Sequence, residues 1–551
     1  MTSQLTRQKA GTNLLRKLTA SPALPAWVRS LQAPVLKRLV DQIGVADATE
    51  IIVHSTTSQM QELFEVVLWE SLEPGRPESH RPEKFLEWAD AMLGAGEAFT
   101  AHRLIELGED FITQNLAPLV AVYESDLLAS HDDEGRCECI TCRFDARDVP
   151  WDQLGDYVIA AEHADEWDTV RTLIMSLDDA DSRCLQRILA RCCRRAISRG
   201  FSDDGQHSAA DAAAERQQKR ESTGYVTPEL AAVFLRTTRT TDSETLLREA
   251  RYDDITAQCF RARTAHAAKA ESPEASTEKD DEPSPSISDL EQHQLDTILR
   301  EGEVIAEIPL LLAAPQNTNA FVPELQTHLD RLQWTDSTAF MTRLSELVHL
   351  ANVLVAGARF KGNRFTEPDA ARAALSCANL GLDLWLTAQN LTRHAERRDA
   401  IENVLMDEPG VVKLFRIGWQ TLQALPRRCG HALIEALQDP HLRGRLSRRA
   451  WILAEIDSAI SDPDLLGLID EAEFEDVSDN LHLLTLILDQ RACRCLQTLI
   501  TDWPQYPVQL ETGLEHAKLD NPEVRNVSTV RHLERIERFL EDLHLYLKID
   551  A

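Results

Sequence analysis

Apolar residues recur at helical spacing along most of this chain, and this spacing constrains the fold more than any other feature. In the stretch DSTAFMTRLSELVHLANVLVAG, which starts at Asp336, apolar residues lie three, four and seven positions apart. They form one helical face: Leu344, Leu347, Val348, Ala351, Leu354 and Val355. Asp336 or Ser337 can cap the start of this helix, and Gly357 can end it.

Other stretches carry the same signals. Thr366-Glu367-Pro368-Asp369 has capping-box spacing with proline in the first turn, and Ser528 precedes an apolar face that begins at Val530. Near the N-terminus, APVLKRLVDQIG predicts a short helix that stops at Gly44, followed by further short helices. We find no series of alternating strands with hairpin signals. The expected fold class is therefore all-α: an irregular, α-solenoid-like helical array without a fixed repeat period.

Composition suggests how this array is divided. Residues 202–223 are polar, and residues 268–289 are rich in Ser, Pro and Glu and nearly free of apolar residues. Such a segment cannot bury enough surface to offset the entropy of ordering, so we expect disorder there. Four regions follow: a basic N-terminal arm (1–30), an N-terminal helical domain (31–200), a mobile middle (201–287) with a small helical module near 227–264, and a C-terminal helical domain (288–551).

The charge balance limits the possible partners. The formal net charge of −32 argues against general nucleic-acid binding, because duplex affinity comes mainly from Lys and Arg on phosphates. The longest apolar runs, such as 308–315, are far shorter than the roughly 20 residues of a membrane-spanning helix. The basic N-terminus lacks the apolar core of a secretory signal. We therefore expect a cytoplasmic protein without a transmembrane segment, whose eleven cysteines are mostly reduced thiols.

Two stretches resemble an uncharacterised bacterial family known only as a domain of unknown function. They are PVLKRLVDQIGVADATEIIVHSTTSQMQELFEVVLWE with FLEWADAML, and ELVHLANVLVAGARFKGNRFTEPDAARAALSCANLGLDLWL. The resemblance covers about residues 31–124 and 335–386 and implies a helical protein, without an activity. In pattern alone, residues 31–70 are also similar to the superhelical cytosolic N-terminal domain of MgtE-type magnesium transporters.

A cysteine-rich loop, HDDEGRCECITCRF, is one candidate for chemistry. Cys137, Cys139 and Cys142 place three thiols within six positions, and His131 is the first choice for a fourth zinc ligand. Cys184, Cys192 or Cys193 are alternatives for that ligand if the fold brings them near the loop. The loop can hold zinc, undergo reversible oxidation or be a surface loop with free thiols; we favour the last interpretation and expect no cofactor.

An arginine stripe is the other candidate. It consists of five arginines at successive i+4 positions, which lie along one face of a helix: Arg183, Arg187, Arg191, Arg195 and Arg199. Guanidinium groups suit carboxylates and phosphates, so the stripe is a candidate site for a protein partner or an anion. In a chain with 90 acidic residues, pairing with the protein's own acids is the simpler expectation.

The search for enzyme signatures is negative. The chain has no Gly-rich phosphate loop, HExxH or GxSxG motif. We expect its tryptophans, among them Trp88, Trp167 and Trp334, to be core anchors. The sequence favours a noncatalytic interaction or scaffold protein that presents helical surfaces to a protein partner. The alternatives are a metal- or redox-responsive regulator that uses the cysteine loop, and an enzyme with an unrecognised site. The sequence does not identify the partner, the pathway or the oligomeric state.

Overall fold

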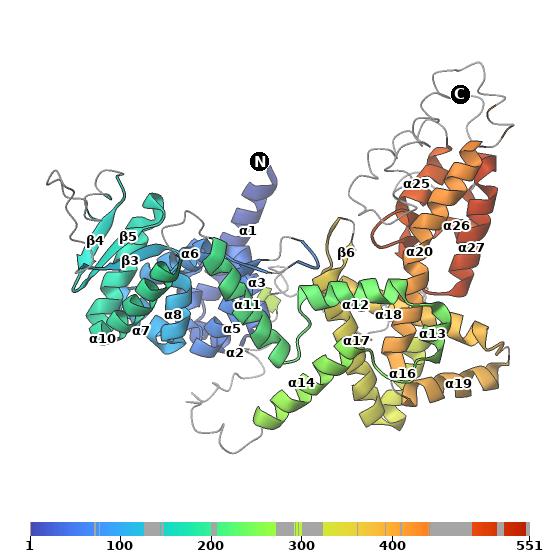
Figure 1. Ribbon diagram of the computed structural model, residues 1–551, viewed down its shortest axis with the longest axis horizontal. Coiled ribbons are helices and arrows are strands. Elements are labelled where there is room, and N and C mark those ends of the chain that lie inside the picture. The colour runs from blue at the N-terminus through green and yellow to red at the C-terminus, as the bar shows by residue number, and fades with distance from the viewer. Residues whose placement is uncertain are drawn as a thin grey trace. The chain divides into compact units, whose positions relative to one another are not determined.

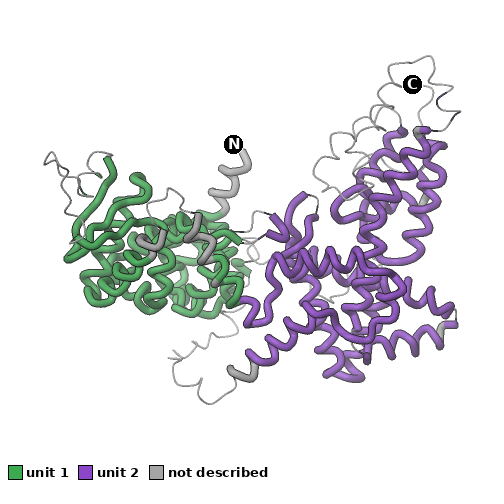
Figure 2. Tube along the Cα trace, viewed as in Figure 1, with its two compact units in different colours: residues 1–72, 77–219, 269–308 green, residues 73–76, 220–268, 309–551 purple. Residues whose placement is uncertain are grey.

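The chain forms two compact units in the computed structural model (Figures 1 and 2). Unit 1 consists of residues 1–72, 77–219 and 269–308, and unit 2 of residues 73–76, 220–268 and 309–551. The structure describes residues 2–70, 73–76, 78–125, 141, 144, 148–199, 206–270, 291, 294–295, 297–299, 323–360, 362–391, 393–407, 410–438, 440, 443, 488–514 and 523–546.

Unit 1 is built mainly from short helices. Its elements, in chain order, are α1 (Thr2–Thr19), α2 (Leu24–Ser30), α3 (Ala33–Ile43), η1 (Val45–Asp47), α4 (Thr49–His54), α5 (Thr57–Val67), β1 (Trp69–Glu70), β2 (Ser79–His80), α6 (Pro82–Leu93), α7 (Glu97–Leu107), α8 (Glu109–Leu116), β3 (Val120–Glu124), β4 (Trp151–Leu154), β5 (Tyr157–Ala161), η3 (Ala164–Glu166), α10 (Trp167–Arg199) and α11 (Gln206–Ser222). The expected basic arm takes part in this unit, since Leu14, Leu18 and Trp27 are buried in its core.

A three-stranded antiparallel sheet in unit 1 was missed by the sequence analysis. Its strand order is β3-β5-β4, and Gly155 and Asp156 form the two-residue turn between β4 and β5. Gly-Asp between two apolar runs is a recognised hairpin signal, so the information was present in the sequence. The remaining described sheets have two short strands each, and the fold is predominantly all-α as expected.

Unit 2 contains longer helices. Its elements are α12 (Pro228–Thr240), α13 (Ser243–Arg248), α14 (Asp254–Ala270), α16 (Glu324–Thr335), α17 (Ser337–Gly357), β6 (Arg359–Phe360), β7 (Asn363–Arg364), α18 (Glu367–Ala388), α19 (His394–Met406), α20 (Gly410–Gln438), α25 (Gln490–Leu499), β8 (Gln505–Pro507), α26 (Gln509–Thr512), β9 (Val524–Asn526), α27 (Val530–Glu541) and η7 (Asp542–Tyr546).

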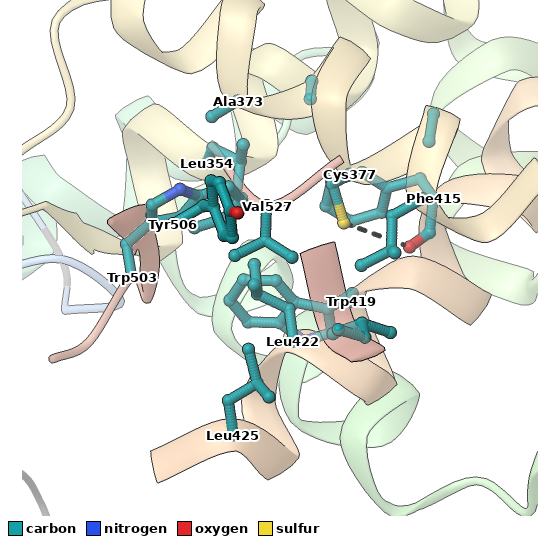
Figure 3. Close-up of a cluster of buried hydrophobic side chains, with 14 of the residues drawn as sticks. Leu354, Ala373, Cys377, Phe415, Trp419, Leu422, Leu425, Trp503, Tyr506 and Val527 are labelled. Carbon is teal, nitrogen blue, oxygen red and sulfur yellow. Dashed lines mark hydrogen bonds between the residues drawn. The ribbon is translucent and has the colours of Figure 1, made fainter. Parts of the chain in front are cut away.

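The core of unit 2 is organised around the crossing of α18 and α20. A Cβ atom on Gly381 of α18 would lie 1.7 Å from the carbonyl oxygen of Leu414, and one on Gly418 of α20 would lie 2.0 Å from that of Cys377. The two glycines therefore allow direct contact between the helix backbones. Nearby, the Cys377 thiol donates to the carbonyl oxygen of Phe415 at 3.5 Å (Figure 3). Large apolar side chains such as Trp419 fill the space beside the crossing (Figure 3).

Several helix boundaries follow the sequence signals. Asp336 caps α17 by accepting from the Ala339 amide at 3.0 Å, and Thr366 caps α18 by accepting from the Asp369 amide. The face of α17 was placed slightly wrongly, however. Val348 is exposed, whereas three polar residues of this helix are buried: Arg343, Glu346 and His349.

One described helix, α17, is long and apolar enough to cross a membrane by length and composition, and half of its most apolar window is buried in unit 2. This leaves no clear transmembrane segment among the described residues.

The two units are discontinuous along the chain. Composition had suggested boundaries near residues 200 and 288. Residues up to 219 pack with unit 1, residues 220–268 pack with unit 2, and residues 269–308 again belong to unit 1. The segment expected to be disordered, 268–289, lies outside the described residues from position 271 onward.

Candidate functional site

The cysteine-loop prediction falls on residues whose structure is not described. Cys137, Cys139, Cys142 and His131 all lie outside the described residues, so zinc binding there stays a prediction. Within the described part of the chain, no three His, Cys, Asp or Glu side chains cluster as metal ligands would.

The arginine stripe lies on the second half of α10. Asp181 has non-helical dihedral angles (φ −155°, ψ 90°) and divides α10 into two helical parts. Its carboxylate accepts from the Cys184 amide at 3.0 Å, which is the contact of an N-cap residue. The sequence therefore starts a new helix here, immediately before the arginines.

Two arginines of this stripe pair with acids of unit 1. Arg187 lies 2.7 Å from Glu109, and Arg191 lies 3.1 Å from Glu109 and 2.6 Å from Asp110. Both acids belong to the first turn of α8, where the helix dipole also favours negative charge. A hydrogen bond from Arg187 lowers the pKa of Glu109 below its usual value.

The other three arginines of the stripe have no ion pair that the structure describes. Arg183 is exposed and forms no ion pair with any described residue. The side chains of Arg195 and Arg199 are not described. The described pairs are therefore internal, and binding of an external anion or protein partner to the stripe stays a prediction.

Among the exposed large apolar side chains of unit 2 are one tryptophan and two methionines. Trp334, expected to be a core anchor, is 86% exposed. Met341 is 58% exposed and Met406 is 54% exposed. We call these three residues the apolar surface. The tryptophan expectation is wrong at position 334 but holds for Trp88 and Trp167, which are buried.

Two ion pairs link the helices that carry Trp334 and Met406. Glu324 at the start of α16 pairs with Arg397 of α19 at 2.7 Å, and Arg331 further along α16 lies 3.6 Å from Glu402 of α19. The two pairs follow the same order along both helices, so long side chains link α16 to α19. Trp334 and Met406 each follow about one turn after the second pair, at the C-terminal ends of the two helices.

The third residue, Met341, lies near the start of α17. Asp336 both follows α16 and caps α17, so Met341 lies little more than one turn from the end of α16. Two residues later, Arg343 donates from Nη1 to the carbonyl oxygen of Asp407, which directly follows Met406. This 2.9 Å hydrogen bond holds the backbone that follows Met406 against α17, the helix that carries Met341.

A buried polar cluster lies deeper on α17. Arg343 and Glu346 are 3% and 0% exposed, and their side chains form an ion pair at 3.0 Å. The Glu346 carboxylate also accepts from the Tyr252 hydroxyl and, at 2.7 Å, from the Val411 amide. Burial raises the pKa of Glu346 to about 7, although the Arg343 guanidinium and these hydrogen bonds oppose that rise.

His349 lies one turn further along the same face of α17. Its Nε2 is 3.3 Å from the Thr256 hydroxyl, and its Nδ1 has no hydrogen-bond partner among the described residues. Phe260 packs beside the ring at a centroid distance of 5.3 Å. Burial lowers the pKa of His349 to about 3, so the imidazole is neutral at physiological pH.

Sequence reasoning missed both features for identifiable reasons. Polar residues at positions 343, 346 and 349 resemble the solvent face of an amphipathic helix, and their partners at 252 and 411 are far away in the sequence. One feature of the sequence could have predicted the exposure of Trp334. This residue directly precedes Thr335 and Asp336 at the end of a helix, where fewer neighbours cover a side chain.

Comparison with known proteins supports part of the expected resemblance. Residues 2–140 match the model of a family of unknown function, DUF6178. The DUF6178 match covers about a quarter of the chain, from α1 to beyond β3, and agrees with the expected likeness to an uncharacterised family. No curated protein and no solved structure matches the chain.

The MgtE likeness expected for residues 31–70 has no support in these comparisons. The DUF6178 match ends before the arginine stripe, and the apolar surface and the buried polar cluster also lie beyond it. None of these three features therefore takes a function from the family.

Proposed function

We propose that the protein is a noncatalytic, cytoplasmic interaction or scaffold protein whose unit 2 binds a protein partner through the apolar surface. The observation that carries this proposal is the 86% exposure of Trp334 at the end of α16, with Met341 and Met406 also exposed in the same unit. Exposed apolar residues that occur singly are ordinary, but an almost fully exposed tryptophan is uncommon because its large ring is usually buried. Tryptophan is enriched among residues that dominate binding energy, and methionine adapts to irregular partner surfaces.

The backbone beneath this surface favours binding without rearrangement. Asp336 caps α17, and the Arg331–Glu402 pair joins the helices that carry Trp334 and Met406. Because folded helices hold all three side chains, little backbone entropy is lost when a partner binds.

Site-specific photo-crosslinking tests this function. A benzophenone amino acid replaces Met341 in the full chain, in its native cell, and the same group at Thr240, an exposed position on α12, serves as the control. We expect one protein to be crosslinked at 341 and not at 240. An identical adduct pattern at both positions would refute the proposal.

A matched pair of variants then measures the contribution of the tryptophan. Trp334→Asp should weaken binding of the identified partner by about 30-fold, which corresponds to the roughly 2 kcal/mol of an interface hot spot. Gln333→Asp places the same charge on the neighbouring exposed residue and should leave affinity nearly unchanged. Equal affinities for the two variants would exclude Trp334 from the interface.

A further inference from the structure

Glu346 links three segments of unit 2 that are distant in the sequence. Its carboxylate contacts Arg343 on its own helix, Tyr252 in the turn between α13 and α14, and the Val411 amide in the first turn of α20. The side chain is completely buried. A single ionisable group therefore connects α17 to two neighbouring elements.

We propose that Glu346 is a proton-dependent latch that fastens the α13–α14 turn and the start of α20 to α17. The inference goes beyond the proposed function, because it requires no partner. When ionised, the carboxylate accepts from the Tyr252 hydroxyl and the Val411 amide. When protonated, the carboxyl group donates its proton to a hydrogen bond with the Tyr252 oxygen, which then acts as acceptor, so the turn stays attached without a buried negative charge.

The packing around Glu346 leaves the Arg343 side chain little room to adopt another position. Gly410 precedes Val411 with φ of +42°, and a Cβ atom there would lie 1.5 Å from Nη1 of Arg343. The guanidinium group therefore occupies the space of a missing side chain. It is fixed between Glu346 and the carbonyl oxygen of Asp407.

The sign of the pH dependence follows from the two states of the latch. In the closed state burial raises the pKa of Glu346 to about 7, and in an opened, hydrated state the pKa returns towards 4.5. The closed state therefore binds a proton more tightly. Its stability relative to the open state is greatest below pH 4.5 and decreases as the pH rises through 7. From pH 6 to pH 8 the contribution of Glu346 to the opening constant increases about tenfold.

Neighbouring groups add their own pH dependence. The elements that meet at the latch carry further charged and titratable groups besides Arg343 and Tyr252. They are His349 on α17, Glu249 and Asp253 on the two sides of Tyr252, Arg263 on α14, and Lys413 and Arg416 on α20. His349 has the opposite effect to Glu346, because its lowered pKa returns towards 6.5 on exposure and favours opening in acid. A test must therefore separate Glu346 from His349.

Hydrogen exchange of the full chain provides this separation. We compare the natural protein with Glu346→Gln, which cannot lose a proton but retains an acceptor for Val411, at pH 6 and pH 8. The exchange rates of residues 252–264 and 411–416 are corrected for intrinsic chemistry. The pH dependence that His349 adds to opening is the same in both proteins. It therefore cancels when the exchange rate of the natural protein is divided by that of the variant. We expect this ratio to rise about tenfold between the two pH values.

Two further variants make the outcome decisive. Glu537→Gln changes a half-exposed acid on α27 and should give a ratio that does not vary with pH. Tyr252→Phe removes a hydrogen bond from both protonation states of Glu346, but the bond to the ionised carboxylate is the stronger one. The pKa of Glu346, and with it the midpoint of the pH dependence, should therefore move upward. If the ratio of natural to Glu346→Gln exchange rates is the same at pH 6 and pH 8, the latch is refuted. If Glu346→Gln does not fold, the latch is refuted when Tyr252→Phe leaves the midpoint of the pH dependence of exchange unchanged.

Discussion

The crossing of α18 and α20 predicts a large cost for one added methyl group. In Gly381→Ala the new Cβ atom would lie 1.7 Å from the carbonyl oxygen of Leu414, whereas such contacts are essentially never shorter than 3.0 Å. The helices must therefore separate by about 1.3 Å at this point, the difference between these two distances. A gap of 0.5–1 Å already removes about a quarter to a half of the dispersion energy of each contact.

We expect Gly381→Ala to destabilise unit 2 by about 3 kcal/mol, at the upper end of the usual cost of overpacking. The intrinsic preference of alanine for helices offsets only about 0.5–1 kcal/mol of the strain. For a unit of this size, the thermal midpoint should fall by about 5 °C. Circular dichroism at the helical band and calorimetry both measure this change.

Gly94→Ala is the matched control. Gly94 ends α6 with helical dihedral angles (φ −59°, ψ −24°), and its Cβ atom would approach no atom closer than 3.3 Å. This substitution should leave the thermal midpoint unchanged or raise it slightly, because alanine restricts the unfolded chain. If Gly381→Ala behaved like Gly94→Ala, the two helices would not cross in backbone contact and the reasoning would be wrong.

Three other predictions concern charge and sulfur. Changing Arg187 and Arg191 together to Gln should leave the thermal midpoint within experimental error, because exposed ion pairs contribute little; a clear loss would mean that the stripe supports the fold. Cys429 and Cys495, whose pKa values are raised by burial to about 12, should resist alkylation in the native protein, as mass spectrometry can map; labelling faster than global unfolding would contradict their burial. Protein purified without chelator should contain no stoichiometric zinc; about one zinc per chain, lost when the three loop cysteines become serine, would instead support the metal-binding alternative.

The sequence predicted features that depend on local chemistry. The limits of α17 follow from Asp336 as cap and from apolar spacing, because both signals act within a few residues. It did not predict the inward direction of Glu346, because its partners at 252 and 411 are 94 and 65 residues away. A buried carboxylate is tolerated only where distant segments supply donors, and no local pattern records that supply.

In the candidate sites, too, the sequence predicted local features and missed those that depend on tertiary packing. The arginine spacing placed Arg183 and Arg187 on an exposed face of a helix, as the structure has them. The pairing of Arg187 with Glu109 depends on how α8 packs, which spacing alone cannot show. Trp334 was misjudged because a large apolar side chain is usually buried, and only its position at the end of α16 sets it apart. Surface features of this kind depend on the absence of covering neighbours, a tertiary property.

The discontinuity of unit 1 has a consequence for synthesis on the ribosome. Leu295 and Leu299 are 1% and 0% exposed within the core of unit 1, yet they follow residues 220–268 of unit 2 in the chain. The 80 residues between 219 and 299 take about 4–16 s to translate at typical rates. For that interval the nascent unit 1 lacks two leucines that complete its core, so apolar surface stays open to chaperones and aggregation. A chain that terminates early at residue 219 would keep that surface open permanently, and quality-control proteases should remove it.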